Sequence, residues 1–163
     1  MKSIFILFSM ATSVVSRAHD DVTLQEETTD LKFYGNSKIG TSENSEFFVA
    51  AIESGDKLVF KYKFNREADP KIPDSGYRET IIFEIEPNET KFSLLDDELQ
   101  TIQPFYRQFC FCRNTESVKI TNGKISGTKI SATKWNIYID VDIVFKQGQN
   151  PVNKQISGNF ILD

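Results

Sequence analysis

Hydrophobic and polar residues alternate along most of the chain. The longest alternation covers residues 135–145, where Trp135, Ile137, Ile139, Val141, Ile143 and Phe145 occupy every second position. Residues 58–64 and 77–86 repeat the pattern over shorter lengths. Successive side chains of a strand point to opposite faces of a sheet. The alternation therefore predicts strands with one buried and one solvent-facing side.

Eight segments have strand character: 47–52, 58–64, 77–86, 105–112, 118–121, 124–131, 135–145 and 155–162. Residues 53–57 are short enough to join the first two as a hairpin, and Asn122-Gly123 is a strong hairpin signal for 118–121 with 124–131. Only residues 94–102 have a helix-forming composition, which indicates either one short helix or a loop.

The spacing of these segments predicts an all-β fold, because no helices alternate with the strands. We expect an antiparallel two-sheet β-sandwich of about eight strands, with a closed β-barrel as the alternative. At most one short helix, near 94–102, accompanies the strands.

The first residues have the layout of a secretory signal peptide, with Lys2, an apolar run over residues 4–15, and small residues at Ser16 and Ala18. The run is shorter than the roughly 20 residues that a membrane-spanning helix needs. We expect residues 1–18 to be cleaved off, 19–30 to form a flexible acidic lead-in, and 31–163 to form a single domain. The product is then secreted or periplasmic, with no stable membrane anchor.

The chain is acidic, with 19 basic and 23 acidic residues among 163 and a net charge of −4. Cleavage after Ala18 removes two basic residues and no acidic one, which brings the net charge to −6. The basic residues form no clustered stripe along the chain, and we interpret Lys61 and Lys63 as solvent-facing strand positions. An acidic chain does not attract nucleic acid, so we expect no nucleic acid partner.

The only two cysteines, Cys110 and Cys112, point the same way if their strand is regular. Their Cα atoms are then about 6.7 Å apart, at the upper edge of disulfide geometry. Exported proteins nevertheless rarely keep free thiols. Three states stay open: a local strained disulfide, reduced thiols, and bonding to a metal or another chain. The pair supports the alternative function of a thiol redox or copper-handling protein.

Few residues suit catalysis. His19 is the only histidine and stands at the expected new N-terminus, which excludes a histidine-based triad or a three-histidine zinc site within one chain. The carboxylates of Asp140, Asp142 and 96–98 lack the spacing of a calcium loop, and we interpret them as solvated. We therefore expect no catalytic residue, no metal site, no cofactor and no enzymatic activity.

Aromatic side chains offer one further interpretation, a surface that binds sugar or peptide. Trp135 lies on the apolar face of its strand, which favours the core. Tyr106 and Tyr138 lie on more polar faces, so we predict that they are surface contacts, while Phe105, Phe109 and Phe111 point inward. The hypothesis is an exported, non-enzymatic β-sandwich that binds an unknown protein or glycan partner.

Overall fold

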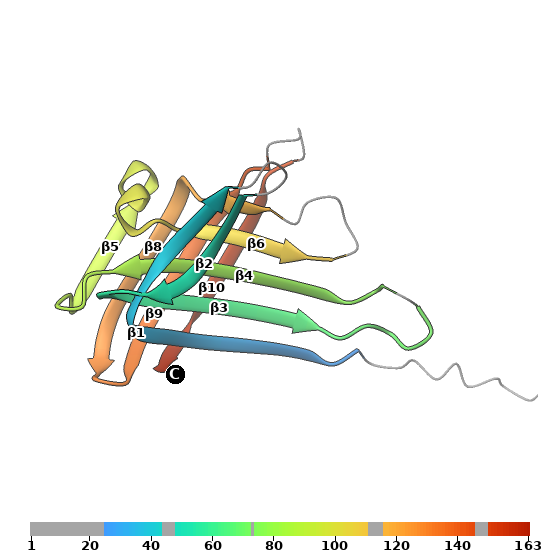
Figure 1. Ribbon diagram of the computed structural model, residues 1–163, viewed down its shortest axis with the longest axis horizontal. Helices are drawn as coiled ribbons and strands as arrows, with labels where there is room; N and C mark the ends of the chain where they lie inside the picture. The colour runs from blue at the N-terminus through green and yellow to red at the C-terminus, as the bar shows by residue number, and fades with distance from the viewer. Residues whose placement is uncertain (1–24, 44–47, 73, 111–115, 146–149) are drawn as a thin grey trace, which may run out of the picture.

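The computed structural model describes residues 25–43, 48–72, 74–110, 116–145 and 150–163. These residues form ten strands and one short 3₁₀ helix (Figure 1): β1 (Glu27–Glu43), β2 (Phe48–Ser54), β3 (Lys57–Arg66), β4 (Tyr77–Ile85), β5 (Lys91–Leu95), η1 (Asp96–Ile102), β6 (Phe105–Phe109), β7 (Ser117–Lys119), β8 (Asn122–Ser131), β9 (Lys134–Ile143) and β10 (Val152–Leu162). The predicted all-β class and the short helix within 94–102 are confirmed. No helix in the described ranges has the length and hydrophobicity needed to cross a bilayer.

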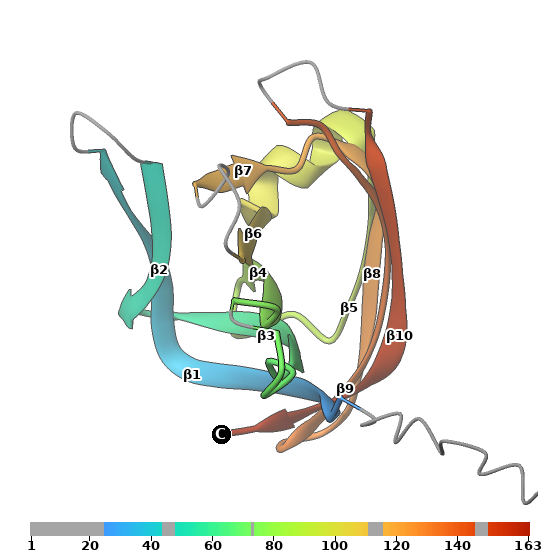
Figure 2. The same ribbon diagram turned by 90° about the vertical axis from the view of Figure 1, so that its right-hand side faces the viewer.

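All ten strands belong to one sheet, which curls into a half-barrel (Figure 2). Nine follow the order β5-β8-β9-β10-β1-β3-β4-β6-β7, and β2 pairs with β1 beside this path. The β1–β10 pair is parallel and the other pairs are antiparallel. The predicted pair of separate antiparallel sheets is not found, because strand twist lets one sheet curl and bury its own inner face. Among the described strands, β5 and β7 end the path and do not pair with each other, so the alternative closed barrel is not found either.

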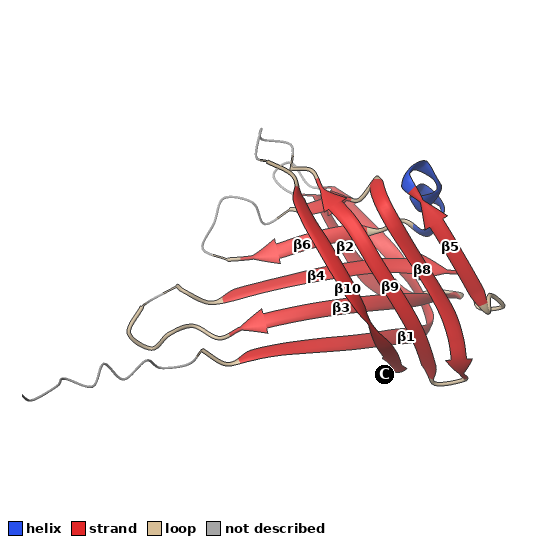
Figure 3. Cartoon of the chain, turned by 180° about the vertical axis from the view of Figure 1, so that it is seen from behind, coloured by secondary structure: helices blue, strands red, loops and turns tan. Residues whose placement is uncertain are grey.

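The inner face of the half-barrel holds the main core, between the layer β5-β8-β9-β10 (Figure 3) and the layer β3-β4-β6. The alternation predicted for residues 135–145 is confirmed, since five inward side chains of β9, from Trp135 to Ile143, have no exposed surface. Phe60 stacks on Phe83 with ring centroids 5.0 Å apart and meets the edge of Trp135 at 5.4 Å. Aromatic packing therefore joins the two layers.

The long strand β1 was not predicted, because Gly35 and Asn36 interrupt its alternation. Its first half pairs with β3 and its second half with β2, and a bulge separates the halves between Tyr34 and Ser37. Of residues 53–57, which we predicted to be a hairpin turn, residues 53 and 54 end β2 and Lys57 begins β3, so only Gly55 and Asp56 lie between the two strands. The predicted β2–β3 hairpin is wrong, because both segments pair along β1.

A bulge bends a strand pair, and here it turns residues 37–43 and β2 away from the rest of the sheet (Figure 2). We call this two-stranded piece the arm. The arm folds across the outer face of β3, β4 and β6. A second, smaller core lies beneath it and consists of buried Ile39, Ala50, Val59, Ile82 and Phe105.

The predicted hairpin between 118–121 and 124–131 is also wrong. Strand β7 pairs with β6, and β8 pairs with β5 and β9. Gly123 lies within β8 opposite Val141 with a φ of +114°, and a Cβ atom there would lie 2.3 Å from the Asp140 carbonyl oxygen. Asn122-Gly123 thus permits a close approach of two strands rather than a turn.

The described chain begins with residues 25 and 26, and β1 starts at Glu27. Residues 27–30, which we placed in the flexible lead-in, are therefore part of the sheet. Strand β5 was not predicted either, since its five residues have only two half-buried side chains. The predicted signal peptide and cleavage site at Ala18 lie outside the described residues and stay predictions.

Candidate functional site

The predicted surface position of Tyr106 is wrong. Its side chain is only 2% exposed, because the even-numbered residues of β6 face the interior of the half-barrel. Phe105 does point to a core, but to the smaller one beneath the arm. Strand β6 has cores on both sides, so its polar pattern could not indicate which face meets solvent.

Tyr138 lies on the outer side of β9 and is half-buried. Its hydroxyl donates a hydrogen bond to Asp140 Oδ2 at 3.0 Å and accepts one from Gln155 Nε2 at 2.9 Å. Asn153 Nδ2 donates to Asp140 Oδ1 at 3.2 Å and to Asp142 Oδ1 at 3.0 Å. These side chains form a polar network across the outer side of β9 and β10, and a contact role for Tyr138 stays a prediction.

The strand that carries the cysteine pair ends at Phe109, one residue before Cys110. Cys112 lies outside the described residues, so the state of the Cys110–Cys112 pair stays a prediction. His19 lies outside them as well. Within the described ranges, no group of three or more histidine, cysteine, aspartate or glutamate side chains is arranged to hold a metal ion.

The most prominent polar feature of the interior is a buried carboxylate, Glu79, on the inner face of β4. Its side chain is 3% exposed. Tyr62 donates to Oε1 at 3.1 Å, and Tyr77 and Tyr106 lie 2.7 and 3.0 Å from Oε2. Lys154 reaches across from β10 and lies 2.8 Å from Oε1 and 2.7 Å from Oε2. We call these five residues the Glu79 cluster.

Electrostatics keep Glu79 charged. Burial acts to raise the pKa of its carboxyl group, but the hydrogen bonds from Lys154, Tyr77 and Tyr106 and the charge of Lys154 outweigh burial, and the net pKa is lowered. The tyrosines shift the opposite way. Burial first, and then the hydrogen bond to Glu79 and the charge of Glu79, raise the pKa of Tyr77 to about 12, although the hydrogen bond with Tyr106 and the charge of Arg66 act to lower it. Burial first, and then Tyr77 and Glu79, raises the pKa of Tyr106 well above its ordinary range.

The cluster connects the two layers of the half-barrel. A buried charge needs partners for its lone pairs, and here three strands and β10 supply four donors to one carboxylate. Such a carboxylate is fully engaged and is not available as a general base. Sequence alternation placed Glu79 on the inward face of 77–86, which was the available signal, but it could not show that Lys154 lies opposite.

A cavity of about 530 Å³ opens beside the edge strand β7. It lies between the arm, the strands β6 and β7, and the end of β9. Its apolar wall consists of Phe48, Phe105, Val118, Val144 and Phe145, and its polar wall consists of Thr41, Gln103, Glu116, Ser117 and Lys119. Phe145 also meets the Tyr106 ring edge to face at 6.0 Å, so the cavity borders the Glu79 cluster.

Hydrogen bonds at two places hold the walls of the cavity in position. The second buried carboxylate, Glu84, accepts hydrogen bonds from the Ile39 backbone N–H at 2.7 Å, and from Lys57 Nζ and Gln103 Nε2, both at 3.0 Å. It thereby fixes the base of the arm relative to Gln103. Further out, the Ala50 N–H donates to Ser117 Oγ at 2.9 Å and joins the arm to β7.

The cavity has the properties of a site for a small ligand. Known ligand pockets span about 300–1,000 Å³ and combine an apolar lining with a few polar groups. The sequence did not predict this cavity, because its lining residues come from five separated segments between Thr41 and Phe145. Comparison of the chain with protein families, with curated proteins and with solved structures finds no match.

Proposed function

We propose that this protein binds a small amphipathic molecule in the cavity beside β7. The apolar part of the ligand contacts Phe48, Phe105 and Phe145, and its polar head lies toward Lys119 and Glu116. The observation that carries the proposal is the cavity itself, with a volume of about 530 Å³ and a predominantly apolar wall. The proposed function is therefore ligand binding, in which the protein catalyses no reaction of the ligand.

Preorganisation supports the proposal. The hydrogen bonds of Glu84 to Ile39 and of Ala50 to Ser117 fix two walls of the cavity before a ligand arrives. Binding of a ligand then costs less free energy, because these parts of the protein are already ordered. At about 0.3 kcal/mol per heavy atom, a ligand of roughly 20 atoms binds with a Kd in the tens of micromolar.

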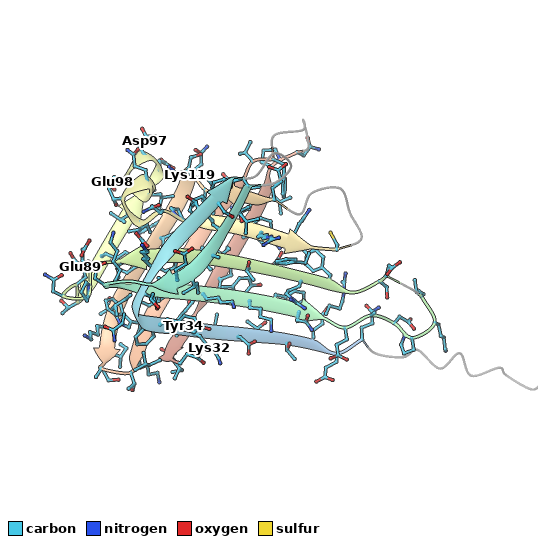
Figure 4. All side chains as sticks on the ribbon, in the orientation of Figure 1. Lys32, Tyr34, Glu89, Asp97, Glu98 and Lys119 are labelled. Carbon is cyan, nitrogen blue, oxygen red and sulfur yellow. The ribbon has the colours of Figure 1, made fainter. Side chains whose placement is uncertain are left out.

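The polar rim determines the head group. Lys119 is exposed and Glu116 is half-buried, and neither has an ion pair within the part of the chain that the structure describes (Figure 4 labels Lys119). An anionic head contacts Lys119, a cationic head contacts Glu116, and a zwitterion contacts both. The secretion predicted from residues 1–18 places such a ligand outside the cell or in the periplasm.

A ligand panel tests the proposal. Decanoate, decylamine and decanol share one apolar chain and differ in the head group, and isothermal titration calorimetry of the purified protein compares their affinities. We expect at least one to bind with one-to-one stoichiometry. Lys119→Gln should then weaken a carboxylate ligand selectively, whereas Glu116→Gln should weaken an amine selectively.

A matched pair of variants locates the binding site. Val144 lines the cavity and is 49% exposed, and Val152 is 41% exposed and does not line it. Val144→Trp should obstruct the cavity and abolish binding, while Val152→Trp should leave the affinity unchanged. Equal affinities of the two variants, or no binding of any of the three probes to the unmodified protein, would contradict the proposal.

A further inference from the structure

Gln103 has an unusual backbone conformation for its residue type. It follows η1 with φ 45° and ψ 59°, in the left-handed region that favours glycine. Its backbone N–H donates to the Gln100 carbonyl oxygen at 3.4 Å, and the carbonyl oxygen of the next residue, Pro104, accepts a hydrogen bond from the Ile120 N–H at 2.9 Å. These contacts fix the turn between η1 and β6, and they hold a glutamine where glycine would be less strained.

The side chain of Gln103 contacts a buried carboxylate and also lines the cavity beside β7. Its Nε2 atom donates to Glu84 Oε1 at 3.0 Å. Within the described part of the chain, the buried side-chain nitrogen and oxygen atoms that lack a hydrogen-bond partner are Arg66 Nε and Trp135 Nε1. Gln103 Oε1 accepts no hydrogen bond there either and is not one of these buried atoms, so it is open to solvent.

Glu84 fixes the orientation of this amide. It forms an ion pair with Lys57 Nζ at 3.0 Å, and its side chain is 3% exposed. A carboxylate paired in this way accepts hydrogen bonds and donates none, whereas one end of an amide donates and the other accepts. The reverse orientation of Gln103 would place two acceptor oxygens against each other. Nε2 therefore faces Glu84, and the accessible Oε1 is an acceptor that Gln103 presents to the cavity.

We propose that Gln103 selects ligands whose polar head donates a hydrogen bond. This rests on the proposed function, because the ligand is the amphipathic molecule bound beside β7. An alcohol or an ammonium group can donate to Gln103 Oε1, whereas a carboxylate or an ether has no hydrogen to donate. Phe105 lies two residues further along the chain and lines the same cavity, so one ligand can reach the amide with its head and the aromatic ring with its apolar chain.

The fixed orientation of the amide is the source of the selectivity. A glutamine amide that is free to rotate presents either end to a ligand, so it accepts from a donor and donates to an acceptor. With Nε2 held by Glu84, an acceptor head group meets the lone pairs of Oε1 and stays unpaired after it leaves water. Leaving a polar group unpaired costs free energy, which disfavours such a ligand. Backbone strain of the kind found at Gln103 occurs at binding sites where neighbouring contacts maintain it.

Two isomeric probes measure the selectivity. Decanol and methyl nonyl ether contain the same atoms, and only the alcohol donates a hydrogen bond. In isothermal titration calorimetry we expect the unmodified protein to bind decanol about tenfold more tightly than the ether, because one hydrogen bond contributes that much to affinity. Gln103→Met keeps the length of the side chain and removes the acceptor, so both isomers should then bind equally. Comparison of decanol with decylamine distinguishes a hydroxyl head from an ammonium head.

Two further variants complete the experiment. Gln100 is an exposed residue of η1 that does not line the cavity, so Gln100→Met makes the same chemical change as a matched control and should retain the tenfold preference. Glu84→Gln leaves Gln103 in place but releases its amide, because the new side chain both donates and accepts. The preference for decanol should fall in this variant, which provides the same test if Gln103→Met does not fold.

The results separate selection by Gln103 from the proposed function. Equal affinities of the two isomers for the unmodified protein, or a preference that persists in Gln103→Met and Glu84→Gln, would overturn selection by Gln103 and leave the cavity as a binding site. Binding of decanoate but not of decanol would overturn it in the same way. If decanol, decylamine and decanoate all fail to bind, the proposed function itself is contradicted, and selection by Gln103 with it.

Discussion

Replacing Lys154 by methionine removes the cation that lies against the buried Glu79 carboxylate. The lysine side chain is 25% exposed and the glutamate side chain 3% exposed, so the substitution leaves a nearly buried charge without its counter-ion. Breaking a buried ion pair from one side costs about 3–5 kcal/mol. The lower end applies here, because Lys154 is partly solvated and three tyrosine hydroxyls still surround Glu79. We expect the free energy of unfolding to fall by about 3 kcal/mol.

Urea denaturation followed by tryptophan fluorescence measures this loss. Trp135 is the only tryptophan and has no exposed surface, so its emission reports the main core. With an m-value of about 2 kcal/mol/M, the urea midpoint should fall by about 1.5 M. The variant Glu79→Gln/Lys154→Met should recover part of the stability, because a neutral amide is less costly to bury than an unpaired carboxylate.

The pH dependence provides a second readout. The pKa of Glu79 is lowered below its ordinary value of 4.5 in the folded protein. Below pH 4.5 the unfolded chain binds the proton first, so the stabilisation is present above this value and is lost as the pH falls through the folded pKa. Lys154→Met removes the main cause of the lowering, and burial should then raise the pKa. The variant should therefore lose less stability than the unmodified protein on acidification.

An exposed ion pair serves as the matched control. Lys63→Met breaks the exposed pair with Asp30, in which the two side chains are 34% and 47% exposed, and should change stability by less than about 1 kcal/mol. If Lys154→Met and Lys63→Met lower the free energy of unfolding equally, the buried pair in the Glu79 cluster contributes no more to stability than an exposed one.

Three further predictions concern the same fold. Tyr106→Phe removes a buried hydroxyl that contacts Glu79 and should lower the free energy of unfolding by about 1–2 kcal/mol in urea denaturation; no change would show that the remaining donors suffice. Gly123→Ala places a side chain at a φ of +114° against the backbone of β9 and should destabilise by more than about 1 kcal/mol, whereas Gly35→Ala, which meets nothing within 4 Å, should cost less. The pKa of Tyr77 is raised from 10.0 to about 12, so the contribution of Tyr77 to the free energy of unfolding is fully present below pH 10 and is lost as the pH rises toward 12. An absorbance titration of the folded protein that showed all tyrosines ionising near pH 10 would contradict this.

The alternation of hydrophobic and polar residues predicts which side chains point inward where one face of a strand is buried and the other faces solvent. Strand β9 meets this condition, and its inward residues were predicted correctly. Strand β6 does not, because Tyr106 faces the main core and Phe105 faces the core beneath the arm. Where both faces pack, alternation of polarity no longer distinguishes inside from outside.

The sequence by itself determined the all-β class and the inward face of β9, because the period of a strand is a local property, and it left residues 94–102 open between a short helix and a loop. The tertiary structure alone decided which strands pair, and it placed β2 and β3 along β1 instead of against each other. It also brought Lys154 to Glu79, 75 residues apart. These contacts depend on register and on the bend at one bulge, which no short stretch of sequence encodes.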